Sequence, residues 1–226
     1  MTHRPIVNVS TEFFTGADWC RFIVAAADAI DTHADELSHL DAVTGDGDHG
    51  ANVAAALGHA RSQITHHDGA SPGTILAITA DSFLDHMGGA AGALFGSFFA
   101  AAAASLGDAD AVDVRQFADA VAIGTAVVTK RGKASPGDKT MIDALIPAVV
   151  ASRRAADRGV SVDEMLQLTA QAARDGATAT TSMRASVGRA RYTGDKSVGV
   201  QDPGATSVAL IFESWAEAAR RPEADR

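Results

Sequence analysis

The chain has 226 residues, of which 46% are hydrophobic and only 5% aromatic, and its formal net charge is -9 at pH 7. This length suits one domain or at most two, with enough apolar residues for a sizeable core. An acidic chain binds nucleic acid poorly, because neutralising phosphates takes Lys and Arg. The chain also has no basic amphipathic segment for anionic membranes and no uninterrupted apolar run of about 18 residues. We therefore expect no membrane span, no signal peptide and a cytoplasmic location.

Apolar residues recur at helical spacing along most of the chain, and no alternating β-branched run stands between turn residues. We therefore expect an all-α protein. Residues 1–16 are expected to be an extended lead, and the charged tail, residues 220–226, is expected to be disordered. The sequence predicts eight helices, at about residues 18–37, 50–65, 72–86, 93–106, 113–129, 140–156, 162–183 and 203–219.

Capping residues mark several of the expected helix starts. Asp18 is expected to cap the first helix and Ser161 the seventh. Ser71 and Asp202 are each followed by a proline, which is favoured at the first helical position. These signals place the third and eighth helix starts most firmly.

The most informative stretch is the acidic segment that follows the first helix, residues 40–52. Asp41, Asp46 and Asp48 lie within eight residues, in a segment that also holds three glycines. Carboxylates this close repel one another unless a cation lies between them, and all-oxygen ligands favour a hard divalent ion such as Mg²⁺. Taken alone, the stretch is equally consistent with a tight polar turn.

Three known motifs are excluded. Gly45, Gly47 and Gly50 match G-x-G-x-x-G formally, but no strand precedes them and the acids would repel a pyrophosphate unless a metal intervened. A calcium-binding EF-hand loop starting at Asp46 fails, because it would need a glycine at Ala51. The chain contains no G-x-x-x-x-G-K-[ST] loop. Any phosphate site must therefore use a metal and helix ends.

Polar, glycine-rich loops follow the first, third, fifth and seventh helices. The loop at 88–92 leaves the next helix N-terminus bare, which suits an anion or simply a tight turn. The basic loop at 130–139 either faces phosphates or complements the preceding helix C-terminus. In an up-and-down bundle, alternate loops lie at the same end. The acidic loop, these two loops and the loop at 188–201 should therefore form one rim suited to a metal-bridged polyphosphate.

Four ordered motifs give the chain a family resemblance. It resembles the nucleotide-binding L subunit of dihydroxyacetone kinases, from about Asp18 to the last helix. The motifs that carry the resemblance are Gly45-Asp46-Gly47-Asp48-His49-Gly50-Ala51-Asn52, Gly88-Gly89-Ala90-Ala91-Gly92, Gly137-Asp138-Lys139-Thr140-Met141 and Gln201-Asp202-Pro203-Gly204-Ala205-Thr206-Ser207.

The resemblance implies one domain over residues 1–226, an eight-helix antiparallel barrel with ADP or ATP bound at one rim. By position, Asp41, Asp46 and Asp48 match the ligands of two Mg²⁺ ions that bridge the nucleotide phosphates. Gly132 and Met141 match positions that line the base pocket. The other positions matched to nucleotide contacts are His49, Asn52, Ala90, Ala91, Arg189, Asp202, Pro203 and Gly204.

The resemblance also implies a partner. In the family a separate K subunit holds the ketose, so this chain would present the phosphoryl group and supply no catalytic nucleophile. Members use either ATP or a bound ADP that a phosphocarrier protein recharges. Two departures from the family pattern are Ala91, where a serine is common, and Ser186-Val187, where many relatives carry a basic pair.

Several alternatives stay open at this stage. Because of these departures, we leave open whether the ketose is dihydroxyacetone or another short ketose such as erythrulose. A nucleotide-binding regulatory module that contacts a transcription regulator is a second reading. A bundle whose inward-facing alanines leave room for an apolar ligand is a third. The sequence does not decide between a monomer and a homodimer.

Overall fold

The computed structural model describes residues 13–67 and 69–220. Within this part of the chain lie eight α-helices, two short 3₁₀ helices and one pair of two-residue strands. The elements are β1 (Phe14–Thr15), α1 (Gly16–Thr44), α2 (His49–Ile64), α3 (Pro72–His86), α4 (Gly89–Leu106), β2 (Ala111–Val112), α5 (Val114–Gly132), α6 (Ile142–Arg158), α7 (Val162–Ala179), η1 (Thr180–Ser182), η2 (Ala190–Ser197) and α8 (Pro203–Ala219).

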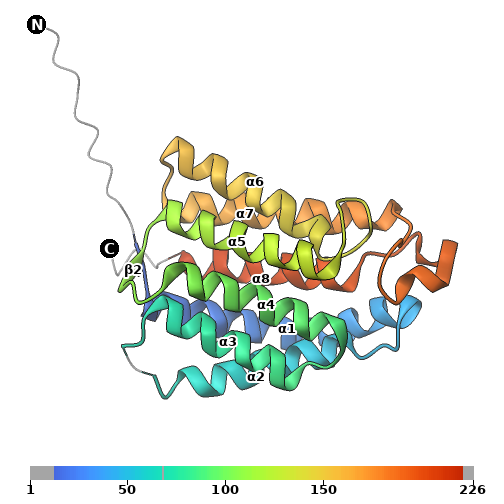
Figure 1. Cartoon of the computed structure of the whole chain (residues 1–226), viewed down its shortest axis with the longest axis horizontal. Helices are drawn as coiled ribbons and strands as arrows, with labels where there is room; N and C mark the ends of the chain where they lie inside the picture. The colour runs from blue at the N-terminus through green and yellow to red at the C-terminus, as the bar shows by residue number, and fades with distance from the viewer. Residues whose placement is uncertain (1–12, 68, 221–226) are drawn as a thin grey trace, which may run out of the picture.

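The eight α-helices form a closed ring (Figure 1). Each helix packs against the next one in the chain, and α8 returns to pack against α1. Successive helices run in opposite directions, so the connections alternate between the two ends of the ring. The predicted all-α, antiparallel up-and-down arrangement is confirmed.

The strand pair is the one departure from the expected absence of strands. Phe14 pairs with Val112 and Thr15 with Ala111 in an antiparallel ladder. It joins the start of the described chain to the connection between α4 and α5. Two residues are too few to produce the alternating pattern by which a strand is recognised in a sequence.

The predicted bounds of the first helix were wrong at both ends. Thr15 is the N-cap, and Asp18 is the third helical residue of a capping box whose carboxylate accepts a hydrogen bond from the Thr15 backbone N–H at 2.8 Å. The helix does not stop at Leu37 but continues to Thr44, because no glycine or proline interrupts it before Gly45. This extension places Asp41 on the last turn of α1.

The seventh helix was predicted to continue past Met183, but α7 ends at Ala179 and a 3₁₀ turn follows. Consecutive threonines are poor helix formers, and the Thr180 hydroxyl donates back to the Ala177 carbonyl at 2.5 Å. The fifth helix, by contrast, runs beyond Thr129 to Gly132. The predicted caps at Ser71, Ser161 and Asp202 are confirmed by their side-chain hydrogen bonds.

The core is mainly apolar, and it is richest in aromatic side chains at one end of the ring. Trp19 at the start of α1 packs against Phe117 near the start of α5 and Trp215 near the end of α8. Helix α4 is long and apolar enough to cross a membrane by length and composition, but half of that stretch is buried among its neighbours. A core helix of a soluble bundle passes the same test, so α4 is weak evidence for a membrane span.

Glycine allows the closest approach between α6 and α7. A Cβ placed on Gly176 would lie 2.1 Å from the backbone oxygen of Asp143, whereas a Cβ on Gly58 of α2 would meet nothing within 4 Å. Both glycines lie inside helices with ordinary helical backbone angles. They therefore separate the effect of close packing from that of helix propensity.

We expect Gly176→Ala to destabilise the protein by about 1–3 kcal/mol, because the added methyl group forces α6 and α7 apart. Gly58→Ala should stabilise it by about 0.5–1 kcal/mol, because alanine has the higher helix propensity. Chemical denaturation of both variants measures these changes. Equal effects of the two substitutions would contradict the close packing of α6 on α7.

Candidate functional site

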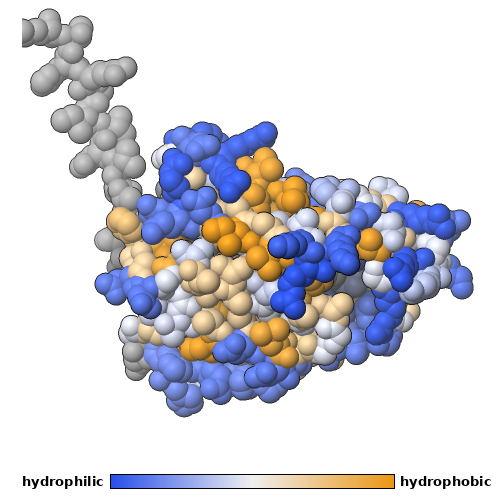
Figure 2. All heavy atoms as spheres, in the orientation of Figure 1, coloured by the Kyte–Doolittle hydropathy of each residue, from blue (hydrophilic) through white to orange (hydrophobic). Residues whose placement is uncertain are grey.

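The connections that follow α1, α3, α5 and α7 meet in one cleft. This cleft lies at the end of the ring opposite the aromatic cluster around Trp19. Its volume is about 370 Å³, within the range of small-ligand sites. On the face in Figure 2, strongly hydrophilic side chains lie at both ends of the bundle and along its lower edge, and more apolar ones lie along the middle. The lining residues are Asp41, Thr44, Gly45, Asp46, Asp48, His49, Asn52, Met87, Gly88, Gly89, Ala90, Ala91, Leu94, Lys139, Thr140, Met141, Val187, Gly188, Arg189, Ala190, Asp202, Pro203 and Gly204.

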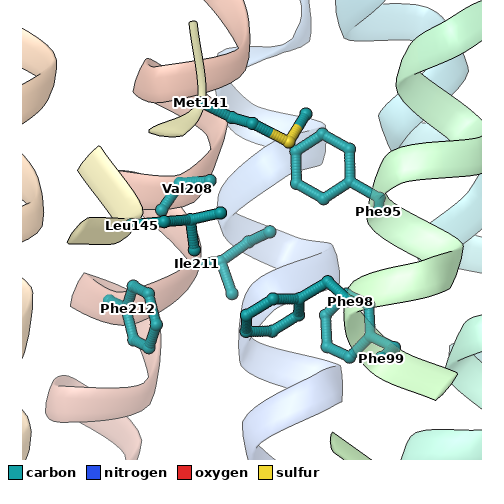
Figure 3. A pocket seen from close by; sticks show the side chains of 8 residues that line it. All are labelled: Phe95, Phe98, Phe99, Met141, Leu145, Val208, Ile211 and Phe212. Carbon is teal, nitrogen blue, oxygen red and sulfur yellow. The ribbon is translucent and has the colours of Figure 1, made fainter. Parts of the chain in front are cut away.

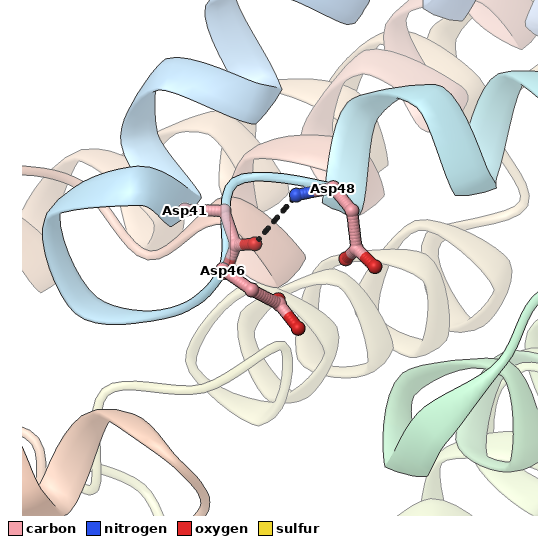
Figure 4. A group of neighbouring side chains, drawn as sticks. All are labelled: Asp41, Asp46 and Asp48. Carbon is pink, nitrogen blue, oxygen red and sulfur yellow. Dashed lines mark hydrogen bonds between the residues drawn. The ribbon is translucent and has the colours of Figure 1, made fainter.

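Three aspartates form a cluster on one wall of the cleft (Figure 4). Each offers a carboxylate oxygen, and these oxygens all lie within 4.8 Å of one another. Asp41 Oδ2 accepts hydrogen bonds from the backbone N–H groups of Gly47 at 2.9 Å and Asp48 at 3.2 Å, which hold the loop against α1. The donor set contains only carboxylate oxygens, which fits Mg²⁺. The structure thus brings together the three predicted ligands, Asp41, Asp46 and Asp48.

Helices α2 and α4 begin at the cleft without a side-chain cap. The N-caps of α2 and α4 are Asp48 and Gly88, and neither makes a side-chain hydrogen bond to its helix. The first backbone N–H groups of a helix have no partner within it, and the helix dipole adds positive potential there. The predicted glycine loop at 88–92 is instead the N-cap and first turn of α4, so the bare helix start lies at Gly88, where it suits an anion.

His49 connects α2 to α8 beneath the cleft. Its Nε2 lies 2.8 Å from the Ser207 hydroxyl, and its side chain is buried. Burial lowers the pKa of His49 despite the nearby negative charges of Asp41 and Asp48. A neutral imidazole is therefore favoured at this position.

A cation already lies against the acidic cluster. Arg189, the residue before η2, forms an ion pair with Asp46. The hydrogen bond from this guanidinium lowers the pKa of Asp46, and Asp46 in turn raises the pKa of Arg189. Both side chains are largely exposed, so this pair is open to competition from solvent ions.

Most residues predicted to contact a nucleotide lie at the cleft. Gly132 is the exception. Gly132 is not among the lining residues, but a Cβ on it would lie 3.6 Å from the side chain of Leu94, which lines the cleft. The predicted residues that do line it are His49, Asn52, Ala90, Ala91, Met141, Arg189, Asp202, Pro203 and Gly204.

The basic loop contributes one cation to the cleft, Lys139. The charge of this residue does not distinguish it from the other cations of the loop. Lys130 and Arg131 are exposed in the last turn of α5, where they complement the helix C-terminus, and Lys133 is exposed beyond it. Lys139 lines the cleft, although it is only 3% exposed. Its position in the Gly137–Met141 motif was the only signal in the sequence.

The lysine and a carboxylate near it have shifted pKa values. Burial lowers the pKa of Lys139, whereas the negative charges of Asp202 and Asp143 act in the opposite direction. Asp202 caps α8 by accepting a hydrogen bond from the Ala205 N–H at 2.7 Å. Burial raises the pKa of Asp202 to about 7, although Lys139 and the cap bonds oppose the shift.

A second, apolar cavity lies inside the ring, beside the cleft (Figure 3). Its volume is about 20 Å³, room for about one water molecule, and its lining is wholly apolar. The phenylalanines of α4 project into the interior between α4 and α8 and fill it. A cavity of this size gives no support to the hypothesis of an interior site for an apolar ligand. The lining residues are Phe95, Phe98, Phe99, Met141, Leu145, Val208, Ile211 and Phe212.

Comparison with known proteins gives consistent matches. Residues 43–217 match the DAK2 domain. The chain is 35% identical over 199 residues to the PEP-dependent dihydroxyacetone kinase, ADP-binding subunit DhaL, of Escherichia coli (strain K12), covering 88% of this chain and 95% of that protein. It is 39% identical over 194 residues to the L-erythrulose kinase of Pectobacterium atrosepticum, covering 84% of this chain but only 32% of that protein.

A solved structure supports the same relationship. The dihydroxyacetone kinase of C. freundii in complex with AMP-PNP and Mg²⁺ superposes with a TM-score of 0.70 at 26% identity. The match covers 96% of this chain and 36% of that one. The chain therefore spans nearly the whole of one curated relative and about a third of the other and of this kinase.

The raised pKa of Asp202 predicts a pH dependence of stability. A carboxyl group with a pKa of about 7 in the folded protein and about 3.9 when unfolded binds its proton more tightly when folded. Its contribution to stability is present at low pH and is lost as the pH rises through about 7. The reference is Asp202→Asn, which keeps a cap acceptor but cannot ionise. Relative to this variant, the free energy of unfolding of the unsubstituted protein should fall by about 1 kcal/mol or more between pH 4 and pH 7. Denaturation across this range measures the difference, and a pH-independent difference would contradict it.

The ion pair at the acidic cluster predicts a competition with metal ions. Arg189→Ala should make Mg²⁺ alone bind several-fold more tightly, because the variant loses the cation that occupies Asp46. Arg191→Ala is the matched control, since Arg191 stacks on Tyr192 instead. Titration calorimetry with MgCl₂ measures both. Weaker Mg²⁺ binding in Arg189→Ala would show that Arg189 helps the cluster to hold the ion.

Proposed function

The chain belongs to the DAK2 domain family, and from this premise we propose that it is the nucleotide-binding subunit of a dihydroxyacetone-type kinase. The observation that carries this proposal is the joining of three carboxylates and an uncapped helix N-terminus in one cleft. Carboxylates suit a divalent cation, and the helix N-terminus suits phosphate. A metal–nucleotide complex satisfies both.

Asp41, Asp46 and Asp48 would hold Mg²⁺, and by the family pattern two ions. Bound there, the metal would neutralise charge on the nucleotide phosphates. The backbone N–H groups at the N-termini of α2 and α4 would donate hydrogen bonds to phosphate oxygens. Ala90 and Ala91 lie in the first turn of α4. Met141 and Gly204 lie close together, since a Cβ on Gly204 would be 3.5 Å from Met141 Cβ, and they would flank the base.

Phosphoryl transfer needs positioning and charge neutralisation more than a protein nucleophile. The cleft supplies both, through its metal ligands, its helix N-termini and the guanidinium of Arg189. The acceptor hydroxyl would come from a short ketose held by a separate K subunit. The high coverage of the E. coli ADP-binding subunit supports this division of labour.

The nature of the ketose and of the phosphoryl donor belongs to the same proposal. The similarity to an L-erythrulose kinase supports erythrulose as an alternative to dihydroxyacetone. The name of the E. coli relative, which is PEP-dependent, supports an ADP that stays bound and is recharged by a phosphocarrier protein. We further propose a cytoplasmic location, as expected for such a subunit. Binding of ADP without any turnover would instead favour the regulatory reading.

We expect Asp46→Ala to abolish Mg²⁺-dependent ADP binding, because the cluster loses one of its three carboxylates. Helicity should be unchanged, since Asp46 lies in a loop. Asp157→Ala is the control: this exposed aspartate lies at the end of α6, on the opposite side of the ring. Titration calorimetry with ADP, with and without Mg²⁺, measures the effect. ADP binding that is equally tight in Asp46→Ala would disprove the metal assignment.

Turnover with a K subunit tests the whole function. The chain and a K subunit are assayed with each ketose, dihydroxyacetone or erythrulose, in combination with each phosphoryl donor, ATP or a phosphocarrier protein. Product in one combination identifies the ketose and the donor. Mg²⁺-dependent ADP binding without product in any combination would move the regulatory reading to first place.

A further inference from the structure

Lys139 is the one buried lysine in the described chain that also lines the cleft. Its ammonium donates hydrogen bonds to two backbone carbonyls, that of Thr180 at the end of α7 and that of Val200 just before α8, each at 2.5 Å. The two acceptors lie 41 and 61 residues further along the chain. One side chain thus joins three separate rim segments.

The local backbone holds Lys139 in a conformation that is unusual for a lysine. Its φ of +61° lies in the left-handed region, which non-glycine residues rarely adopt. On either side of it, the carboxylate of Asp143 accepts hydrogen bonds from the N–H groups of Gly137 at 2.5 Å and Thr140 at 2.9 Å. Such a backbone persists only where the surroundings determine it, and it is found most often at functional sites.

A buried ammonium is costly unless it is fully hydrogen-bonded. Here it donates to the Thr180 carbonyl at the end of α7, which also accepts a hydrogen bond from the Met183 N–H at 3.0 Å, and to the Val200 carbonyl in the η2–α8 connection. Further hydrogen bonds follow the same path: Asp202 N–H donates to the Thr180 hydroxyl and Gly199 N–H to the Thr181 carbonyl, both at 2.8 Å. The ammonium lies at the centre of this junction.

The junction carries one wall of the cleft. Directly beyond Val200 come Asp202, Pro203 and Gly204, which line the cleft at the start of α8. Before it comes η2, preceded by Arg189, which faces the acidic cluster. The opposite wall belongs to α1, α2 and α4 and makes no contact with the Lys139 ammonium among the hydrogen bonds described. Two contacts tie the η2–α8 wall to the opposite one directly, the Arg189–Asp46 ion pair and the His49–Ser207 hydrogen bond, and the Lys139 junction holds it from the other side.

We propose that Lys139 is a positioning residue: through the carbonyls of Thr180 and Val200, it holds the η2–α8 wall at the distance from the acidic cluster that a metal–nucleotide complex requires. This inference rests on the proposed function and adds to it the device that shapes the site. In this proposal the Lys139 ammonium binds backbone carbonyls, and residues of the η2–α8 wall contact the ligand.

The test compares Lys139→Met with Lys133→Met. Both substitutions remove one lysine charge from the same loop, and both lysines have left-handed backbone angles, but Lys133 is exposed. Three quantities are measured: hydrogen exchange of residues 180–202 in the nucleotide-free protein, Mg²⁺-dependent ADP affinity, and affinity for Mg²⁺ alone. The last depends on the acidic cluster and serves as an internal control.

For Lys139→Met we expect hydrogen exchange of residues 198–202 to become at least tenfold faster and ADP affinity to fall at least tenfold, with Mg²⁺ affinity unchanged. Lys133→Met should change none of the three. Lys139→Arg, which keeps a charged donor, should restore part of both losses. If Lys139→Met does not fold, Lys139→Gln replaces it: its neutral amide on a shorter side chain weakens both hydrogen bonds, so smaller losses of exchange protection and ADP affinity in the same direction are expected.

Two outcomes would overturn the proposal. A loss of ADP affinity with unchanged hydrogen exchange would mean that Lys139 contacts the nucleotide directly. Faster exchange with unchanged ADP affinity would mean that the junction only stabilises the fold. Absence of Mg²⁺-dependent ADP binding in the unsubstituted protein would instead refute the proposed function, while the exchange comparison would still report whether Lys139 holds the wall.

Discussion

The structure depends on one constraint, the closure of an even number of antiparallel helices into a ring. Every second connection then returns to the same end, and α8 must pack against α1 to close it. Four connections that are far apart in sequence therefore share one rim and one cleft. The opposite end holds the aromatic cluster around Trp19 and Trp215, so packing and ligand chemistry are separated along the bundle axis.

The rim is a site of unbalanced charge. Asp41, Asp46 and Asp48 lie closer together than isolated carboxylates tolerate, and Arg189 offsets part of their charge from another segment. On the other wall, Lys139 lies near the partly buried Asp202. Of the three clustered aspartates, only Asp46 has an ion-pair partner among the described residues, and the helix N-termini of α2 and α4 have no side-chain cap. The proposed metal with a polyphosphate would complete this arrangement.

The helix count, the caps at Ser71 and Asp202 and the gathering of the loops at one end were predictable from the sequence, because periodicity, capping and loop parity are local or topological signals. Predictions of where helices end were less accurate. Polar residues after Leu37 were taken for a loop, although they are only the exposed face of α1, whereas the threonines after Ala179 end α7 by competing for backbone hydrogen bonds.

The sequence by itself determined the all-α class and the three-aspartate cluster, since those carboxylates lie within one short segment whose own turn brings them together. Only the tertiary structure decided that Arg189 faces Asp46, that Gly132 lies against Leu94 outside the cleft lining, and that Lys139 is buried against Thr180 and Val200. These contacts join residues tens to more than a hundred positions apart. Their partners are selected by helix packing, which no local pattern encodes.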